Sequence, residues 1–168
     1  KEEFLQKGFL DASLQEICKN AGVTTGALYK RFKGKEELFC ALVENTVQDL
    51  EEVVRQKSVL PATLTDEQLK KAWDMDREYM QWWFNYLYDR YDEMRLLLVF
   101  SDGTKYANFE HEWVESMSHT TYAYYKEAQR RGLTKTDISE KELHVMLSSF
   151  WTAICEPLIH GFTKEEAG

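Results

Sequence analysis

The sequence predicts an all-α protein made of short N-terminal helices followed by a larger helical body. Apolar residues recur mostly at spacings of three and four, which is the period of one face of an α-helix. No run of strict apolar–polar alternation is long enough to predict a half-buried strand. Two prolines and eight glycines in 168 residues leave few positions that would interrupt helices.

Capping signals place the helices of the N-terminal part. Ser13 is a good N-cap, and Glu16 stands at the position that completes a capping box. Thr24 or Thr25 can cap the next helix, and Gly34 ends it. The expected helical segments are 1–7, which Gly8 stops, then 13–20, 24–32 and 35–57.

The same signals continue through the body. Residues 58–65, which contain Pro61, are a connector and the best boundary candidate on composition. Ser139 with Glu142 repeats the capping-box spacing, and Gly132 closes the helix before it. Pro157 can kink the last turn of the helix that Ser139 caps. The expected helices are 66–88, 92–100, 106–131 and 139–161, and 163–168 begins another.

Composition favours a soluble globular protein, with 43% apolar and 30% charged residues. Three cysteines without paired spacing argue against a secreted disulfide framework and favour the reducing cytoplasm. The longest uncharged run, residues 143–155, is too short to span a membrane, and no signal peptide is visible. We therefore expect a cytoplasmic protein that has no membrane partner.

Charge is unevenly distributed along the chain, whose formal net charge is −8. Residues 1–39 hold seven Lys or Arg and six Asp or Glu, a balance of +1, so the remainder carries −9. Four of the six residues from Lys30 to Lys35 are basic. This pattern suits a protein whose N-terminal part alone approaches a polyanion. The alternative is that the acidic bias only serves solubility.

The spacing in residues 13–32 is typical of a helix-turn-helix, in which a tight glycine-containing turn joins two short helices. The small Ala21 and Gly22 allow the turn and a close approach of the helices. The alternative is a small helical hairpin with a solvated basic corner. Five apolar residues are expected to lock the two helices together: Ile17, Ala21, Val23, Leu28 and Phe32.

The second helix of this motif is expected to expose small, hydroxylated, aromatic and basic side chains: Thr24, Thr25, Gly26, Ala27, Tyr29, Lys30 and Arg31. A helix with a slim N-terminal face can enter the major groove, where base edges carry the sequence code. Hydroxyl groups can bond phosphates, and Lys and Arg can neutralise them. The N-terminus of the helix that begins near Lys35 is a further expected anion site. The motif therefore favours double-stranded DNA as a partner.

The segment ASLQEICKNAGVTTGALYKRFKGKEELFCALVE resembles the DNA-binding domain of TetR-family (tetracycline-repressor-like) transcriptional regulators. The resemblance covers residues 8–44 and includes the AGV turn, the G-x-L-Y-x-x-F helix and the K-x-K-E-x-L entry to the next helix. It implies a DNA-binding domain over residues 1–44, with a truncated first helix. It also implies a helical effector-binding and dimerisation domain over residues 45–168, with the last helix largely absent.

The resemblance also implies a function. The protein would be a ligand-responsive regulator, and more specifically a repressor, that binds palindromic operator DNA as a dimer and is released by a small effector. The alternative is a helical ligand-binding or adaptor protein whose N-terminal domain binds protein instead of DNA. Carried over by position, the expected DNA contacts are Ser13, Thr24, Thr25, Gly26, Ala27, Tyr29, Lys30, Arg31 and Lys35.

Residues 79–91, YMQWWFNYLYDRY, predict a helix that is apolar most of the way round and lies in the middle of a bundle. Core packing explains any one of these aromatic residues, and a ligand cavity is the alternative. Such a cavity suits a flat, lipophilic or cationic effector. In the family the pocket lies between the central helices, and the expected lining here is Tyr79, Trp82, Trp83, Tyr86, Phe100, Phe109, Trp113, Met117 and Trp151.

The predicted helix 139–161 carries apolar residues on two sides. One side is expected to pack inward and the other to meet a second subunit, as the homodimer bundle of the family does. One of the two sides holds Leu143, Met146, Leu147, Phe150, Trp151, Ile154 and Leu158, and the other holds Val145, Thr152, Cys155 and Ile159.

Catalytic and metal-binding signals are lacking in the sequence. The four histidines are scattered, and His111 and His119 are too far apart on one helix to share a metal. No paired Glu-x-x-His motif, phosphate loop or nucleophile elbow is present. We therefore expect neither an enzyme nor a protein that needs a cofactor or metal.

Overall fold

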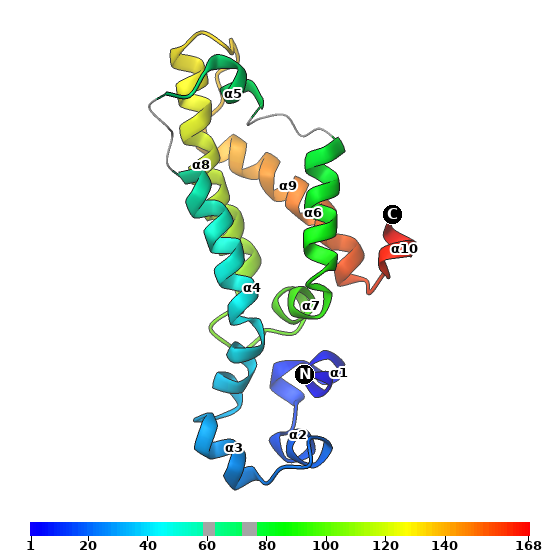
Figure 1. Cartoon of the computed structure of the whole chain (residues 1–168). Helices are drawn as coiled ribbons and strands as arrows, with labels where there is room; N and C mark the ends of the chain where they lie inside the picture. The colour runs from blue at the N-terminus through cyan, green and yellow to red at the C-terminus, as the bar shows by residue number, and fades with distance from the viewer. Residues whose placement is uncertain (59–62, 72–76) are drawn as a thin grey trace. The chain divides into compact units, whose positions relative to one another are not determined.

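The computed structural model describes residues 1–58, 63–71 and 77–168, with side chains through residue 56 in the first range. Every regular element in these ranges is an α-helix (Figure 1), which confirms the all-α prediction. The chain divides into two compact units. Unit 1 contains Lys1–Asp49 and Arg90–Glu110, and unit 2 contains Leu50–Asp89 and His111–Gly168. The functional division after residue 44 stays a prediction, because these units are defined by packing.

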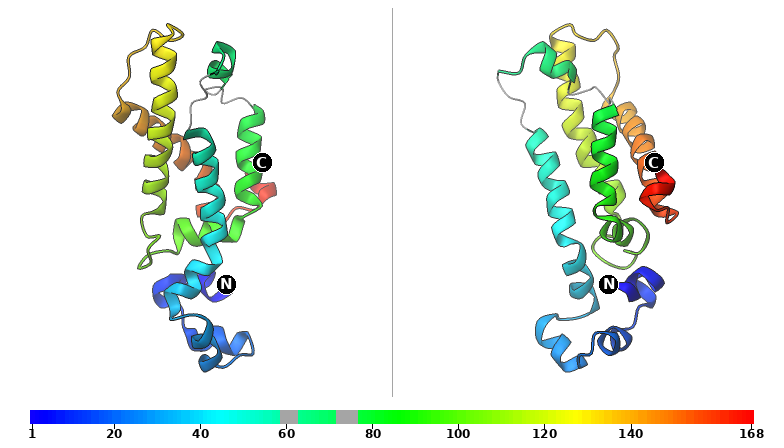
Figure 2. Two further views of the ribbon diagram at one scale, coloured as in Figure 1. Left: turned by 60° about the vertical axis from the view of Figure 1, so that its left-hand side comes forward. Right: turned by 45° about the vertical axis from the view of Figure 1, so that its right-hand side comes forward.

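The helices follow one another in the order seen in Figure 1 and in the two views of Figure 2. Unit 1 holds α1 (Glu2–Asp11), α2 (Leu14–Asn20), α3 (Thr25–Arg31), α7 (Tyr91–Val99) and the first part of α4 (Lys35–Ser58). Unit 2 holds the rest of α4, α5 (Asp66–Lys71), α6 (Arg77–Tyr88), most of α8 (Phe109–Arg130), α9 (Glu140–Ile159) and α10 (Lys164–Ala167). Among the described residues, no helix is both long and apolar enough to cross a lipid bilayer.

Gly8 interrupts α1, whereas the sequence predicted that it would stop the helix. Its φ of 74° lies in the left-handed region, and the chain returns to a helical turn that reaches Asp11. The interruption leaves the amide of Phe9 outside the helical hydrogen-bond pattern, and it donates to the carbonyl of Phe100 at 3.0 Å. Glycine suits this position because it adopts positive φ without steric cost. The kink therefore joins α1 to the end of α7 within unit 1.

Ser13 caps α2 as predicted, since its hydroxyl accepts from the Glu16 amide at 3.4 Å. The second half of the predicted capping box is wrong, because Glu16 pairs with Lys19 instead. The Ser13 amide donates to Oε1 of Glu3 at 3.2 Å. The same oxygen accepts from Nζ of Lys7 at 2.8 Å, and this bond lowers the pKa of the Glu3 carboxyl. A carboxylate of α1 thus completes the cap of α2.

The turn after α2 is a Schellman motif with Gly22 in the left-handed region, at φ 66°. The Val23 amide donates to the Cys18 carbonyl at 3.0 Å, and the Gly22 amide donates to the Lys19 carbonyl at 3.2 Å. These bonds satisfy carbonyl groups that the end of a helix leaves open. The predicted tight turn is therefore confirmed. The close approach predicted for Gly22 is not, because no atom lies within 4 Å of the position its Cβ would take.

We expect Gly22→Ala to destabilise unit 1 by about 1–2 kcal/mol, because a Cβ in the left-handed region crowds the following carbonyl oxygen. Urea unfolding followed by circular dichroism measures this loss. Gly34→Ala is the matched control, since Gly34 also faces open space but lacks a positive φ. Equal losses in the two variants would contradict the conformational explanation.

The loop before α8 delays the start of that helix, which begins at Phe109 and not at the predicted residue 106. Within the loop, the hydroxyl of Thr104 donates to the Ser101 carbonyl at 2.7 Å. The hydroxyl of Ser101 donates to the Tyr106 carbonyl at 3.0 Å. These side-chain bonds hold the backbone in turns, which compete with helix formation.

The later helix ends follow the predicted signals. The Ser139 amide donates to Oε2 of Glu142 at 2.7 Å, and the Glu142 amide donates to Oγ of Ser139 at 3.3 Å, which confirms the capping box. Gly132 closes α8 at φ 71°, and α9 continues through Pro157 to Ile159. The predicted helix 66–88 corresponds to α5 and α6. Its middle, residues 72–76, and Pro61 lie outside the described residues.

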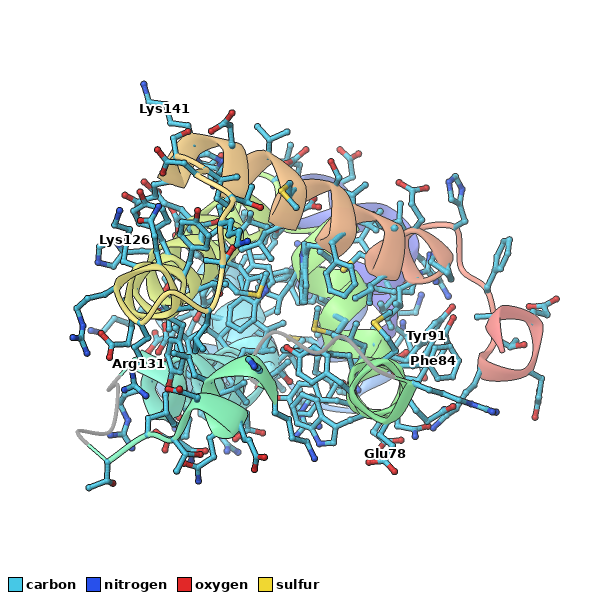
Figure 3. The ribbon with its side chains drawn as sticks, turned by 90° about the horizontal axis from the view of Figure 1, so that it is seen from above. Glu78, Phe84, Tyr91, Lys126, Arg131 and Lys141 are labelled. Carbon is cyan, nitrogen blue, oxygen red and sulfur yellow. The ribbon has the colours of Figure 1, made fainter. Side chains whose placement is uncertain are left out.

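Arg131, near the end of α8 (Figure 3), joins that helix to the start of α5. Its Nη1 donates to the Leu64 carbonyl at 2.6 Å and to Oδ1 of Asp66 at 3.0 Å. Its Nε donates to Oε1 of Glu127 at 2.6 Å, and Arg130 donates to the same oxygen at 2.7 Å. Hydrogen bonds from Arg130 and then Arg131 lower the pKa of Glu127 from 4.5 to about 2.

Because the pKa of Glu127 is lowered in the folded protein, the stabilisation of unit 2 by Glu127 depends on pH. Ionised Glu127 stabilises unit 2 fully above pH 4.5, and this stabilisation is lost as the pH falls from 4.5 towards about 2. We expect Glu127→Gln to lower the urea midpoint at pH 6 and to approach the wild-type value as the pH falls to 3. Glu67→Gln removes the same charge from an exposed side chain of α5 and should show no such convergence. A constant difference between pH 6 and pH 3 would contradict the role of Glu127.

Candidate nucleic-acid interface

Helix α3 presents almost its whole circumference to solvent. Leu28, which is 7% exposed, is the one buried residue of this helix. The hydroxyl of Thr24 caps α3 by accepting from the Ala27 amide at 3.1 Å. Because this bond uses a lone pair, the Thr24 hydroxyl proton stays available for a phosphate oxygen. Thr25, Gly26 and Ala27 are exposed, so the first turn offers a slim surface.

The C-terminal half of α3 carries an exposed phenol and two exposed cations. Tyr29 is 56% exposed, and Lys30 and Arg31 are also exposed. The Arg31 guanidinium lies 5.6 Å from the centroid of the Phe32 ring. A phenol and cations on one short helix are groups that bond and neutralise phosphates.

The packing behind α3 differs in part from the predicted five-residue lock. Ala21 and Val23 are exposed, because they lie in the Schellman turn beyond the end of α2. Cys18, which is 3% exposed, occupies the buried position on α2. The other three predicted residues are buried or half-buried: Ile17, Leu28 and Phe32.

Lys35 is engaged within unit 1. Its Nζ donates to the carbonyls of Leu10 and Ala12 at 2.8 and 3.0 Å and lies 4.8 Å from the Phe9 ring centroid. An ammonium group has three N–H donors, so one remains for the predicted phosphate contact. Lys35 therefore also anchors the end of α1, a role that its position in the motif does not reveal.

The first turn of α4 carries two carboxylates, Glu36 and Glu37, which accept hydrogen bonds from nearby loops. Glu37 accepts from the Lys33 amide, and Glu36 accepts from the Lys105 amide at 3.0 Å. A helix N-terminus attracts negative charge, and here Glu36 and Glu37 supply it. The anion site expected at this helix end stays a prediction.

The N-terminal residues 1–42 match the family model described as bacterial regulatory proteins, tetR family. Residues 1–42 form a helix-turn-helix domain of the TetR type. The match extends from α1 into the first turns of α4, and so includes the cap of α2, the Schellman turn and the whole of α3. The TetR-type helix-turn-helix that the sequence predicted is confirmed.

Three curated relatives share this TetR-type domain. The HTH-type transcriptional regulator AcrR of Shigella flexneri is 44% identical over 50 residues, which are 30% of this chain and 23% of AcrR. The HTH-type transcriptional regulator SrpR of Pseudomonas putida is 42% identical over 50 residues, 30% of this chain and 24% of SrpR. The HTH-type transcriptional activator FasR of Mycolicibacterium smegmatis is 38% identical over 55 residues, 33% of this chain and 25% of FasR. The chain matches about a quarter of the length of these relatives.

Unit 2 contains a separate aromatic cluster, in which tryptophan rings of α6, α8 and α9 meet. Trp83 of α6 lies at its centre, with its ring centroid between 4.9 and 6.3 Å from those of five other rings. The structure thus brings together six of the predicted effector-binding residues: Tyr79, Trp82, Trp83, Tyr86, Trp113 and Trp151.

The other three predicted effector-binding residues lie outside this cluster. Phe100 and Phe109 belong to unit 1. The Phe100 ring centroid lies 5.5 Å from the Arg95 guanidinium, and Phe109 is buried. Met117 is half-buried on α8. The participation of these three residues in an effector site stays a prediction.

A groove between α8 and α9 collects three of the histidines that looked scattered in the sequence. The ring centroids of His111 and His144 are 6.0 Å apart, and Nδ1 of His144 lies 3.2 Å from Oγ of Ser118. Nδ1 of His119 lies 3.0 Å from Oε1 of Glu140. In the described parts of the chain, no three metal-ligating side chains are placed to hold one ion. The grouping of these histidines could not be predicted from the sequence, because it depends on how α8 packs on α9.

The two sides of α9 differ in detail from the prediction. Met146 is predicted to share a side with Leu143 and Trp151, which are buried, but it is 60% exposed. Cys155 is predicted to share a side with Val145, which is exposed, but it is fully buried. Each residue turns the helix by about 100°, so Cys155 shares the face of Trp151, four positions earlier. Met146 lies beside Val145, which is 63% exposed.

Proposed function

We propose that this protein is a transcriptional regulator that binds double-stranded operator DNA as a homodimer and is released by a small lipophilic or aromatic effector. The main observation that supports this proposal is the exposure of the α3 side chains. All of its side chains except Leu28 are presented to solvent, on a domain of the TetR family. The names of the relatives favour DNA over protein as the partner of this domain.

Different parts of the α3 surface suit different parts of DNA, namely base edges and phosphates. Its first turn, with Thr25, Gly26 and Ala27, is slim enough for base edges in the major groove. Tyr29 and Lys30 extend from the next turn and would bond and neutralise phosphates. Ser13, at the start of α2, still has its hydroxyl proton to donate to the same backbone.

Exposed apolar side chains on α9 support a homodimer. Val145 and Met146 are more than half exposed, and the smaller Ser149 and Ala153 follow at helical spacing on the exposed side. Large and small side chains on one exposed face suit packing against a second helix. A two-fold dimer would present two copies of α3 to the half-sites of a palindrome.

We expect Met146→Glu to shift the protein from dimer to monomer and to weaken binding to a palindromic duplex, because the interface would bury an unpaired carboxylate. Sedimentation velocity measures the assembly. Val99→Glu is the control, since it places the same charge on an exposed apolar position of α7. A Met146→Glu variant that sediments like the wild-type dimer would rule out this face.

Effector binding to the aromatic cluster would reach the DNA-binding domain through chain connectivity. Trp83 and Trp113 lie on α6 and α8, and the segment Arg90–Glu110, which contains α7 and leads into α8, belongs to unit 1. Within unit 1, this segment holds α1 through the Phe9–Phe100 hydrogen bond at 3.0 Å. A movement of α6 or α8 would therefore act on the helices around α3. Only an effector that binds the two states unequally can change DNA affinity.

Binding to the DNA upstream of its own gene and of neighbouring genes tests the proposal. Gel shifts should show a complex with a Kd on the order of 10⁻⁸ M that weakens steeply with salt. No complex at low salt would contradict it. A reporter on the same promoter decides the direction of regulation. We expect repression that the effector relieves, although FasR is named an activator.

A further inference from the structure

Two buried indole N–H groups in the aromatic cluster lack an acceptor. Nε1 of Trp113 and Nε1 of Trp151 make no hydrogen bond to any described residue. The two side chains are 5% and 1% exposed, so bulk water does not reach them. Buried polar groups are nearly always paired in folded proteins, so each unpaired one requires an explanation.

The two indoles belong to different helices and meet in the interior of unit 2. Trp113 comes from α8 and Trp151 from α9, and their ring centroids are 5.4 Å apart with an angle of 47° between the planes. Trp83 of α6 adjoins both, at centroid distances of 6.2 and 5.7 Å. The two rings that carry the unpaired donors are therefore neighbours within one aromatic cluster.

The aromatic rings continue from this pair to the surface. Trp82 is 44% exposed, and its ring stacks on that of Tyr86 at 5.1 Å with an angle of 28°. Tyr86 in turn contacts Trp83 at 5.8 Å. Ring-to-ring contacts therefore link the two buried indoles to the exposed Trp82.

We propose that the effector is a flat, largely apolar molecule that carries a hydrogen-bond acceptor such as a carbonyl oxygen, and that Trp113 and Trp151 donate to it. This inference rests on the proposed function and specifies the chemistry of its effector. An indole nitrogen donates but cannot accept, so a ligand group that only donates would leave both N–H groups unpaired. The ring faces of Trp83 and its neighbours suit the apolar frame by offset or edge-on stacking.

Pairs of compounds that differ only in a carbonyl group test whether the effector needs a hydrogen-bond acceptor. 9-Fluorenone and fluorene share one ring frame, as do anthrone and 9,10-dihydroanthracene, and the ketone alone has the acceptor in each pair. Calorimetric titration of the wild-type protein should show that the ketone of at least one pair binds about tenfold more tightly than its hydrocarbon. The indole ¹H–¹⁵N resonances of Trp113 and Trp151, assigned from their Trp→Phe variants, should move downfield with the ketone.

Variants separate hydrogen bonding from packing. Trp113→Phe and Trp151→Phe remove an N–H and keep an aromatic ring, so each should reduce the preference for the ketone. Trp83→Phe is the matched control, because the Trp83 indole is not one of the two unpaired donors. It should weaken ketone and hydrocarbon alike. Urea unfolding of each variant shows that unit 2 remains folded.

The proposal is wrong if no ketone binds more tightly than its hydrocarbon, including the case in which no probe binds. It is also wrong if ketone binding leaves the two indole resonances unmoved, and the N–H groups would then be assigned to buried water. Either outcome leaves operator binding by the wild-type protein intact. Failure of the wild-type protein to bind DNA would instead contradict the proposed function.

Discussion

Replacing Tyr29 by alanine is expected to weaken operator binding by about tenfold or more and to leave the stability of unit 1 unchanged. Tyr29 is 56% exposed on α3, so its truncation removes little packing. The lost interactions are a phenol hydrogen bond to phosphate and ring contacts with the groove. Fluorescence anisotropy with labelled duplex measures the affinity, and urea unfolding measures the stability.

The adjacent Leu28 provides the contrast that makes this result interpretable. Leu28 is 7% exposed, and Leu28→Ala should cost about 2–5 kcal/mol through the cavity it leaves. That variant should lose DNA binding because the domain unfolds. If Tyr29→Ala lowered the urea midpoint as much as Leu28→Ala, its effect on DNA would be structural and the contact role would be wrong.

Replacing both Lys30 and Arg31 by glutamine should reduce the salt dependence of DNA binding. Each phosphate contact contributes about 0.9 to the slope of log K against log salt, so the double variant should lose up to about 1.8. The loss should be similar for specific and random duplexes, because phosphate contacts carry little sequence information. Titrations between 50 and 200 mM salt, the range over which such slopes are commonly compared, measure this slope.

The control for this prediction removes two positive charges elsewhere. Lys70 on α5 and Lys126 on α8 are exposed residues of unit 2, and Lys126 is labelled in Figure 3. Their double replacement by glutamine changes the net charge equally and should leave the slope unaltered. A slope that responds equally to both double variants would mean that only net charge matters, and would contradict a phosphate contact by α3.

Features that depend on a few consecutive residues were predictable from the sequence. The caps at Thr24 and Ser139 and the turn at Gly22 are made by hydrogen bonds within about five residues. The exposed surface of α3 was predictable for the same reason, since the anchors Leu28 and Phe32 are four residues apart and define its inner side.

Features that depend on contacts between helices were not predictable. Glu3 completes the cap of α2 from a position ten residues away, and the kink at Gly8 is explained only by the contact of α1 with α7. Lys35 bonds to the end of α1 for the same kind of reason. In unit 2 the sequence supplied the tryptophans, but the unpaired donors of Trp113 and Trp151 become visible only when α8 and α9 are packed.

Selection of duplexes from a random pool tests the central claim, that α3 of this TetR-type domain reads DNA. The purified wild-type protein should enrich a palindrome that it binds at least about 10³-fold more tightly than a scrambled duplex. Tyr29→Ala should bind the recovered palindrome about tenfold or more weakly than the wild-type protein does. A pool that remains random after selection, or equal affinity for the recovered and scrambled duplexes, would contradict sequence-specific binding by α3.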